Sequence, residues 1–185
     1  MILVHHLIVG RSVFTVWLLE EMGLDYELKI YKRNEMGRAP PELKEAHPLG
    51  KSPVIVDDGL MISETGAIAS YLVDRYDDAN KFAPPRSDVV ARAKWTTWLH
   101  YPEGSAFMPL LITMLLAREA DPKPPVLSAF AAGEVALHLG YMQDQLGDNE
   151  FLLGDEFSAV DIGFTYIAGM AERLGQLGPY PKLGA

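Results

Sequence analysis

The 185-residue chain contains no cysteine. This absence excludes disulfide bonds, thiolate metal ligands and every mechanism in which the protein supplies its own reactive thiol. Any sulfur chemistry carried out by this protein must therefore use a thiol that a ligand brings.

Long hydrophobic runs and clusters of basic residues are also missing. No apolar run approaches the roughly 18 residues that cross a membrane, and the start MILVHHLIVGR has no basic segment before a long apolar core. We therefore expect no membrane anchor, no secretory signal and a cytoplasmic location. The net charge of -9, which no Lys/Arg cluster interrupts, argues against a nucleic-acid partner.

What is present indicates an ordinary globular protein in two parts. The chain is 49% hydrophobic and 22% charged, and it is long enough to bury a sizeable core. The stretch DDANKFAPP, which is polar and then proline-rich, separates regions of different pattern. We predict a first domain over residues 1–77, a linker over 78–85 and a second domain over 86–185.

The first 31 residues predict a strand, a helix and a second strand. Residues 2–9 form an apolar run broken by two histidines, typical of a buried central strand. A turn at Gly10-Arg11-Ser12 leads into a helix that ends at Gly23, and residues 26–31 alternate as a strand. Segments of this length predict a right-handed βαβ unit.

The stretch PLGKSPVIVDDGLMISETGAIASYL carries most of the remaining signals. Pro53 opens a β-branched strand over residues 54–56, where a proline is tolerated as the first residue or in a tight, cis turn. Asp58-Gly59 predicts a hairpin turn into a strand over residues 60–62. Together with the βαβ unit and a following helix, this hairpin predicts a βαβ-ββα domain.

Ser63, Glu64 and Thr65 stand where that following helix should begin. Free N–H groups and the positive end of the helix dipole collect at such a position and favour a carboxylate ligand. The alternative is that Ser63 or Thr65 only caps the helix.

The second half of the chain has helical patterns throughout. The Ser158-Ala-Val-Asp161 sequence is a capping box, which predicts the start of the last long helix. The predicted helices cover residues 89–101, 107–117, 127–146 and 157–174.

Several of these motifs together resemble the glutathione S-transferases, in particular the cytosolic type of fungi and bacteria. The Ser-Pro step, the hairpin and the Glu-Thr helix start resemble the glutathione-binding half of that family. WLHYPEGS at residues 98–105, FLLG before the capping box, and YPKL at residues 180–183 resemble stretches of its second half. The resemblance runs from His5 to about Leu183. It implies an α/β thioredoxin-like N-terminal domain followed by an all-α helical bundle that lacks its final helix.

The resemblance also implies roles for five residues in binding glutathione. The backbone of Ser52 pairs with the cysteinyl unit, and Pro53 supplies the cis bond that follows it. Glu64 and Thr65 hold the γ-glutamyl end, with threonine where the family more often has serine. Lys51 adds positive charge for the anionic glutathione.

The group that holds the glutathione thiolate is less clear, because Gly10 stands where the family has its usual donor, a serine. The pKa of a free thiol, near 8.5, has to fall by about 2 for the thiolate to form at neutral pH. Ser12 is the candidate hydroxyl donor, although it can equally be a plain N-cap. Arg11, which can add positive charge, and the backbone amides around Gly10 are the other candidates.

The resemblance implies a cytoplasmic, detoxifying glutathione transferase. Glutathione would be the co-substrate, attacking a hydrophobic electrophile or reducing a hydroperoxide, and the protein would be a homodimer. The alternative is a glutathione-fold module that binds or interacts without turnover. No metal is expected, because His5 and His6 are adjacent on a strand and point to opposite faces.

Overall fold

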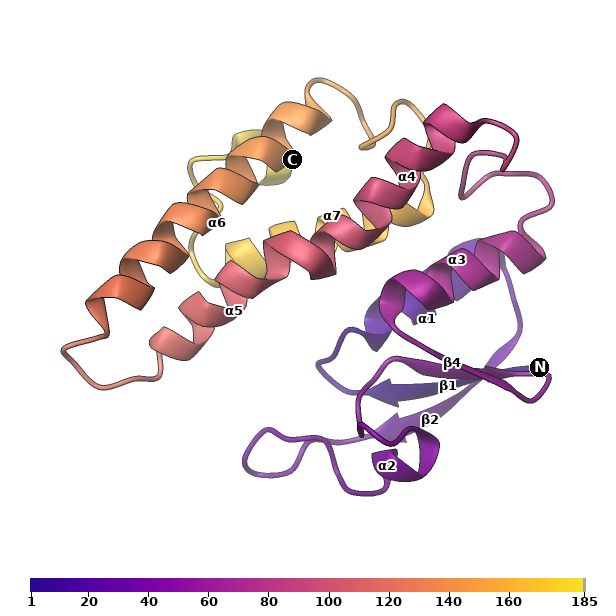
Figure 1. Cartoon of the computed structure of the whole chain (residues 1–185), viewed down its shortest axis with the longest axis horizontal. Coiled ribbons are helices and arrows are strands. Elements are labelled where there is room, and N and C mark those ends of the chain that lie inside the picture. The colour runs from indigo at the N-terminus through magenta and orange to yellow at the C-terminus, as the bar shows by residue number, and fades with distance from the viewer. Residues whose placement is uncertain (185) are drawn as a thin grey trace. The chain divides into compact units, whose positions relative to one another are not determined.

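The computed structural model describes residues 1–184, which form two compact units (Figure 1). The first unit comprises Met1–Phe82 and the second begins at Ala83. This division lies inside the segment predicted as the linker, residues 78–85.

The first unit is a four-stranded sheet with three helices. In the sheet order β2-β1-β3-β4, β1 and β2 are parallel, and β3 is antiparallel to both β1 and β4. This is the predicted thioredoxin-like arrangement, with the first strand in the interior of the sheet. The elements are β1 (Ile2–Leu7), α1 (Ser12–Met22), β2 (Tyr26–Tyr31), α2 (Leu43–Ala46), β3 (Val54–Asp57), β4 (Leu60–Ser63) and α3 (Thr65–Tyr76).

The core of this unit lies between the sheet and its helices. Helices α1 and α3 pack against each other on one face of the sheet, and the short α2 lies on the other (Figure 1). Leu43 of α2 packs there with Leu7 and Tyr31. The largest side chains that are almost fully buried in this unit are Val4, Leu18, Leu19, Leu43, Ile55, Ile68 and Leu72.

The turns follow from residues that accept unusual backbone angles. Gly23 ends α1 with a φ of 65°, in the left-handed region that glycine favours. Asp58 and Gly59 both have positive φ, 48° and 80°, as a tight hairpin between β3 and β4 requires. The Ser52-Pro53 peptide bond is cis, as predicted.

The second unit contains the four predicted helices and two short segments that were not predicted. A π-helical segment, Pro102–Ala106, joins the first two helices where the sequence predicted a break. Proline has no N–H to donate, and Pro102 stands where the hydrogen-bond pattern changes from α-helical to π-helical. The helices are α4 (Val89–Tyr101), α5 (Phe107–Leu116), α6 (Pro125–Leu146) and α7 (Ala159–Arg173), followed by a short 3-10 turn, Pro181–Gly184.

The predicted capping box marks the start of α7, and its acid has an additional role. The Asp161 carboxylate accepts hydrogen bonds from the Ser158 N–H at 2.8 Å, the Ser158 hydroxyl at 3.2 Å and the Leu152 N–H at 2.8 Å. Asp161 therefore ties the preceding loop to the helix. Within residues 1–184, no helix combines the length and the apolar character that crossing a membrane requires.

Candidate functional site

The register of the sheet brings the predicted site segments of the first unit to one end of it. Leu7 at the end of β1 pairs with Tyr31 at the end of β2. His5 pairs with Val54, and Val54 pairs with Ser63 at the end of β4. The turn after β1, the loop after β2, the Ser52-Pro53 step and the start of α3 therefore lie along the same edge.

The backbone amide of Leu7 joins two of these segments. Its N–H lies 3.2 Å from the Ser12 hydroxyl oxygen and 3.3 Å from the Ser52 hydroxyl oxygen. The Ser52 hydroxyl donates in turn to the carbonyl of His5 at 2.7 Å. Because Pro53 has no N–H to donate, the hydrogen bonds of the Ser52 side chain connect β1 to the segment just before β3.

Ser12 is fully buried, and its hydroxyl is engaged with the end of β1. Besides accepting from the Leu7 N–H, that hydroxyl lies 3.4 Å from the Leu7 carbonyl oxygen, to which it donates. Arg11, not Ser12, is the N-cap of α1, and its side chain makes no capping hydrogen bond. The N-cap alternative for Ser12 is therefore wrong, and the hydroxyl is not presented to a ligand in this conformation.

Gly10 is required by a close approach of the backbone. A Cβ atom at this position would lie 2.7 Å from the Leu7 carbonyl oxygen, a distance at which the backbone has to move. Restoring the serine that the family usually has here would therefore distort the turn.

The residue before Gly10 is held by an arginine from the loop after β2. Val9 has a φ of 56°, which is rare for a β-branched residue, and its side chain is 77% exposed. Its carbonyl accepts a hydrogen bond from Nη2 of Arg33 at 2.8 Å. No local sequence signal marks Arg33, because only the parallel pairing of β1 with β2 brings it to this turn.

At the start of α3, Glu64 adopts a strained backbone conformation. Its φ of 73° and ψ of 124° lie outside the regions that residues with a side chain usually occupy. Glu64 is the N-cap but makes no side-chain capping hydrogen bond, while Ser63 ends β4 and Thr65 is the first helical residue. The alternative in which Ser63 or Thr65 is the N-cap is wrong. Strain of this kind concentrates at functional sites.

The other predicted residues differ in their exposure. Lys51 is exposed beside the cis peptide bond, Pro53 is buried, and Arg11 is half-buried at the start of α1. These positions put two cationic side chains at the turns that flank the end of the sheet.

The two histidines of β1 have different surroundings. His5 is buried, and its Nδ1 lies 2.8 Å from the Tyr31 hydroxyl. Burial, and to a smaller degree the charge of Lys29, lower the pKa of His5, while burial lowers the pKa of His6. Both rings are therefore neutral at pH 7. Across residues 1–184, no three His, Asp or Glu side chains are grouped so that they could hold a metal ion.

The chain matches the family described as "Glutathione S-transferase, N-terminal domain" over residues 1–74. It is 34% identical over 197 residues to glutathione S-transferase 3 of Schizosaccharomyces pombe, an alignment that covers 99% of this chain and 80% of the relative.

Two solved structures extend the likeness to both units. A glutathione S-transferase from Actinobacillus pleuropneumoniae is 32% identical with a TM-score of 0.88, and the match covers 100% of this chain and 84% of that one. A glutathione transferase homologue from Lodderomyces elongisporus, with two glutathione molecules per subunit, is 25% identical with a TM-score of 0.80; the match covers 99% of this chain and 89% of that one. The chain belongs to the glutathione S-transferase family.

Proposed function

We propose that this protein is a glutathione transferase that binds glutathione at the end of the sheet in its first unit. The observation that carries the proposal is the register that places the cis Ser52-Pro53 step beside the strained, uncapped start of α3. The name of the S. pombe relative and the glutathione bound to the Lodderomyces homologue support this assignment.

The chemistry of the site matches the two charged groups of the γ-glutamyl unit, its α-carboxylate and its α-ammonium group. The N-terminus of α3 offers backbone N–H groups that the helix itself does not use, and these suit a carboxylate. The Thr65 hydroxyl is a further donor, while the exposed carboxylate of Glu64 suits an ammonium group. We propose that Glu64 and Thr65 hold this unit and that the backbone of Ser52, before Pro53, pairs with the cysteinyl unit.

Two cations offset the repulsion between an anionic ligand and a protein with a net charge of -9. Lys51 lies next to the cis bond, and Arg11 lies at the positive end of α1. We propose that both contribute to binding glutathione.

In the proposed reaction, the bound thiol loses its proton to solvent and the resulting thiolate attacks a hydrophobic electrophile. A carbon–sulfur bond forms, and the leaving group departs with its electron pair. With a hydroperoxide, the thiolate instead attacks the terminal oxygen, the O–O bond breaks, and the alkoxide takes a proton from solvent to leave as an alcohol. The sulfenic acid formed on glutathione then reacts with a second glutathione to give oxidised glutathione and water. Because the chain has no cysteine, none of these steps passes through a protein thiol.

The proposal is tested by calorimetry with glutathione beside conjugation and peroxidase assays over a broad panel of electrophiles. We expect binding and turnover together. Binding without turnover on any substrate would favour a non-catalytic binding module. No binding would contradict the assignment of the site.

Glu64→Gln tests the γ-glutamyl site with little change in side-chain size. Loss of a hydrogen bond to a charged partner costs about 1.5–3 kcal/mol, so the affinity for glutathione should fall by about 10- to 100-fold. Glu27→Gln, at an exposed glutamate of the edge strand β2, is the matched control and should bind normally. Equal affinities in the two variants would mean that Glu64 has only a structural role.

Ser12→Ala tests the predicted hydroxyl donor. Because this hydroxyl is already paired with the backbone of Leu7, we expect only a small loss of conjugation rate and an unchanged pKa of the bound thiol. A loss of about a hundredfold, as when one donor to a developing anion is removed, would show that the hydroxyl turns to the sulfur when glutathione binds.

We also propose that the protein is a cytoplasmic homodimer, on the ground of its family. Analytical ultracentrifugation at micromolar concentration should give about twice the mass of one chain. A single species of monomer mass would contradict the dimer.

A further inference from the structure

We propose that the guanidinium of Arg33 stabilises the glutathione thiolate in place of the hydroxyl that Gly10 lacks. This inference rests on the proposed function and names a catalytic residue for it. In the first unit, Arg33 donates hydrogen bonds to the backbone carbonyls of Val9 and Gly37. Its Nη2 also lies close to the position that a Cβ on Gly10 would take.

The guanidinium is held on both sides by backbone carbonyls. Nη2 donates to the Val9 carbonyl at 2.8 Å, and Nη1 donates to the Gly37 carbonyl at 2.9 Å. A guanidinium has five N–H donors in a rigid plane, so two carbonyls fix its orientation and leave other donors for a ligand.

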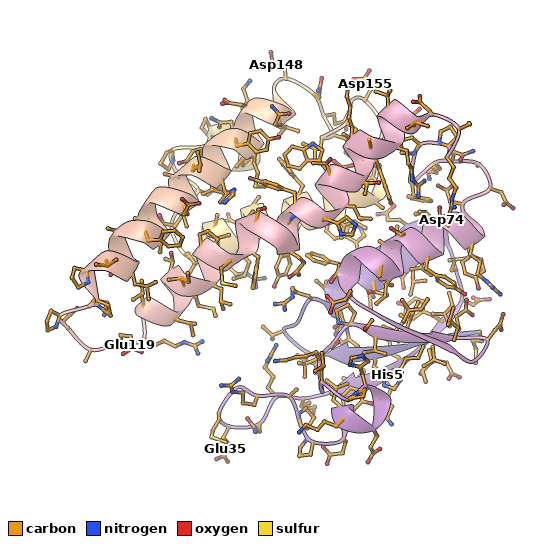
Figure 2. All side chains as sticks on the ribbon, in the orientation of Figure 1. His5, Glu35, Asp74, Glu119, Asp148 and Asp155 are labelled. Carbon is orange, nitrogen blue, oxygen red and sulfur yellow. The ribbon has the colours of Figure 1, made fainter. Side chains whose placement is uncertain are left out.

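The loop that carries Arg33 is itself well organised. The side-chain oxygen of Asn34 accepts hydrogen bonds from the N–H groups of Met36, at 3.1 Å, and Arg38, at 2.9 Å. The Gly37 N–H donates to the Asn34 carbonyl at 2.8 Å. Figure 2 shows Glu35 at the outer end of this loop, so its charge is directed away from the sheet. The second anchor of Arg33 is therefore a built turn, which makes the guanidinium preorganised.

The position of the guanidinium fits the missing donor. Nη2 lies 3.6 Å from an ideal Cβ position on Gly10, so the guanidinium reaches the turn after β1 in which the family's serine would stand. In the proposed complex the thiolate of glutathione lies beside this turn, within reach of the guanidinium. The neutral rings of His5 and His6 add no positive charge at this end of β1.

The charge of Arg33 can account for a large part of the required pKa change. An opposite charge within about 4–6 Å lowers the pKa of an acid by about 1–3. The thiol of glutathione needs a decrease of about 2, and Arg33 is exposed, so we assign about 1 to its charge. Unlike lysine, arginine keeps its charge at every pH at which the enzyme is active.

Three variants separate this role from that of a simple support for the loop. Arg33→Gln removes the charge, Arg33→Lys keeps the charge but loses the planar fork, and Arg38→Gln removes the same charge from an exposed arginine of the same loop. For each, the pKa of bound glutathione is measured from the pH dependence of thiolate absorbance. The affinity for S-methylglutathione, which has no ionisable thiol, is measured by calorimetry.

We expect Arg33→Gln to raise the pKa of the bound thiol by about 1, Arg33→Lys to raise it by less, and Arg38→Gln to leave it unchanged. The affinity for S-methylglutathione should be nearly the same in all three. An unchanged thiol pKa in Arg33→Gln would overturn the inference, as would an equal loss of S-methylglutathione affinity in both Arg33 variants, which is the result for a loop support. If the wild-type protein itself does not bind glutathione, that result contradicts the proposed function and, with it, the role of Arg33.

Discussion

Asp57 ends β3 with a carboxylate that is only 1% exposed. The hydroxyls of Tyr71 and Tyr76 in α3 both donate to its Oδ2, and Nε of Arg75 lies 3.5 Å from the same atom. Burial alone raises the pKa of Asp57, but the hydrogen bonds from the two tyrosines and the charge of Arg75 outweigh it, so the pKa lies below its usual value. The ionised carboxylate thus ties the hairpin to the end of α3.

Asp57→Asn should lower the free energy of unfolding at pH 7 by about 2 kcal/mol, because a neutral amide oxygen accepts the two tyrosine bonds more weakly than a carboxylate and no longer attracts Arg75. Since the folded pKa is below the unfolded value of about 3.9, the stabilisation is complete above that value. It is lost as the pH falls from the unfolded value through the lower pKa of the folded state. Urea unfolding at pH 7, 4 and 3 should show the gap between wild type and variant narrowing with acid.

Asp58→Asn is the control for this prediction. Asp58 is exposed, pairs with Arg75 and sits in the hairpin turn, where asparagine is equally compatible with positive φ. Its stability should stay within about 0.5 kcal/mol of wild type. A similar loss of stability in both variants would mean that the net charge of the hairpin, and not the buried carboxylate, determines the effect.

Gly10 and Gly133 allow the same substitution to be compared at two kinds of site. Gly10→Ala should destabilise the protein by about 1–3 kcal/mol, because its Cβ meets the Leu7 carbonyl oxygen at 2.7 Å. Gly133 is exposed within α6, and a Cβ there meets nothing within 4 Å. Gly133→Ala should therefore stabilise by about 0.5–1 kcal/mol. Thermal unfolding of both variants checks the sign, and a neutral Gly10→Ala would show that the turn relaxes freely.

At the scale of the helix, the start of α7 depends on one buried acid. Asp161 accepts three hydrogen bonds, two from Ser158 and one from Leu152. Asp161→Ala leaves two backbone N–H groups without this partner, at about 1–3 kcal/mol each when buried. We expect a loss of about 3 kcal/mol, measured by urea unfolding. Asp155→Ala, an exposed acid of the loop before α7, should change little. An equally small effect at Asp161 would mean that water replaces the carboxylate.

Most elements could be predicted because their signals are local. Apolar periodicity and the punctuation at Gly23, Asp58-Gly59 and Ser158 specify strands, helices and turns from neighbouring residues alone. Serine and threonine near a helix start were harder to interpret. Ser12 has the composition of a cap, yet its hydroxyl bonds to Leu7, a partner set by the path of the preceding turn.

Contacts between residues far apart in the chain could not be predicted from the sequence. Arg33 is 24 positions from Val9, and nothing in its own neighbourhood distinguishes it from other exposed cations. The close approach of Gly10 to a carbonyl is likewise a property of the folded turn. The continuous path of α4 into α5 through Pro102 was missed because a proline commonly marks a helix boundary.

For the whole molecule, the absence of cysteine makes a clear chemical prediction. Treatment with N-ethylmaleimide, followed by removal of the reagent, should leave the conjugation rate unchanged and add no mass to a thiol, because the chain has no cysteine to be modified. Incubation with oxidised glutathione should produce no mixed disulfide in intact-mass measurements. A matched, unreactive succinimide is the control for solvent effects. A loss of activity specific to the maleimide would show that another nucleophilic side chain is needed for the reaction.

The backbone N–H of Leu7 has two alternative hydrogen-bond acceptors, one in the turn after β1 and one in the cis-proline loop. If either Ser12 or Ser52 loses its hydroxyl, the other can still accept this hydrogen bond. Single alanine variants should therefore be tolerated, whereas the double variant strands a buried donor and should cost about 1 kcal/mol more than the two single losses combined. Chains of this kind can change one of the two positions at a time without losing the connection between the β1 turn and the cis-proline loop.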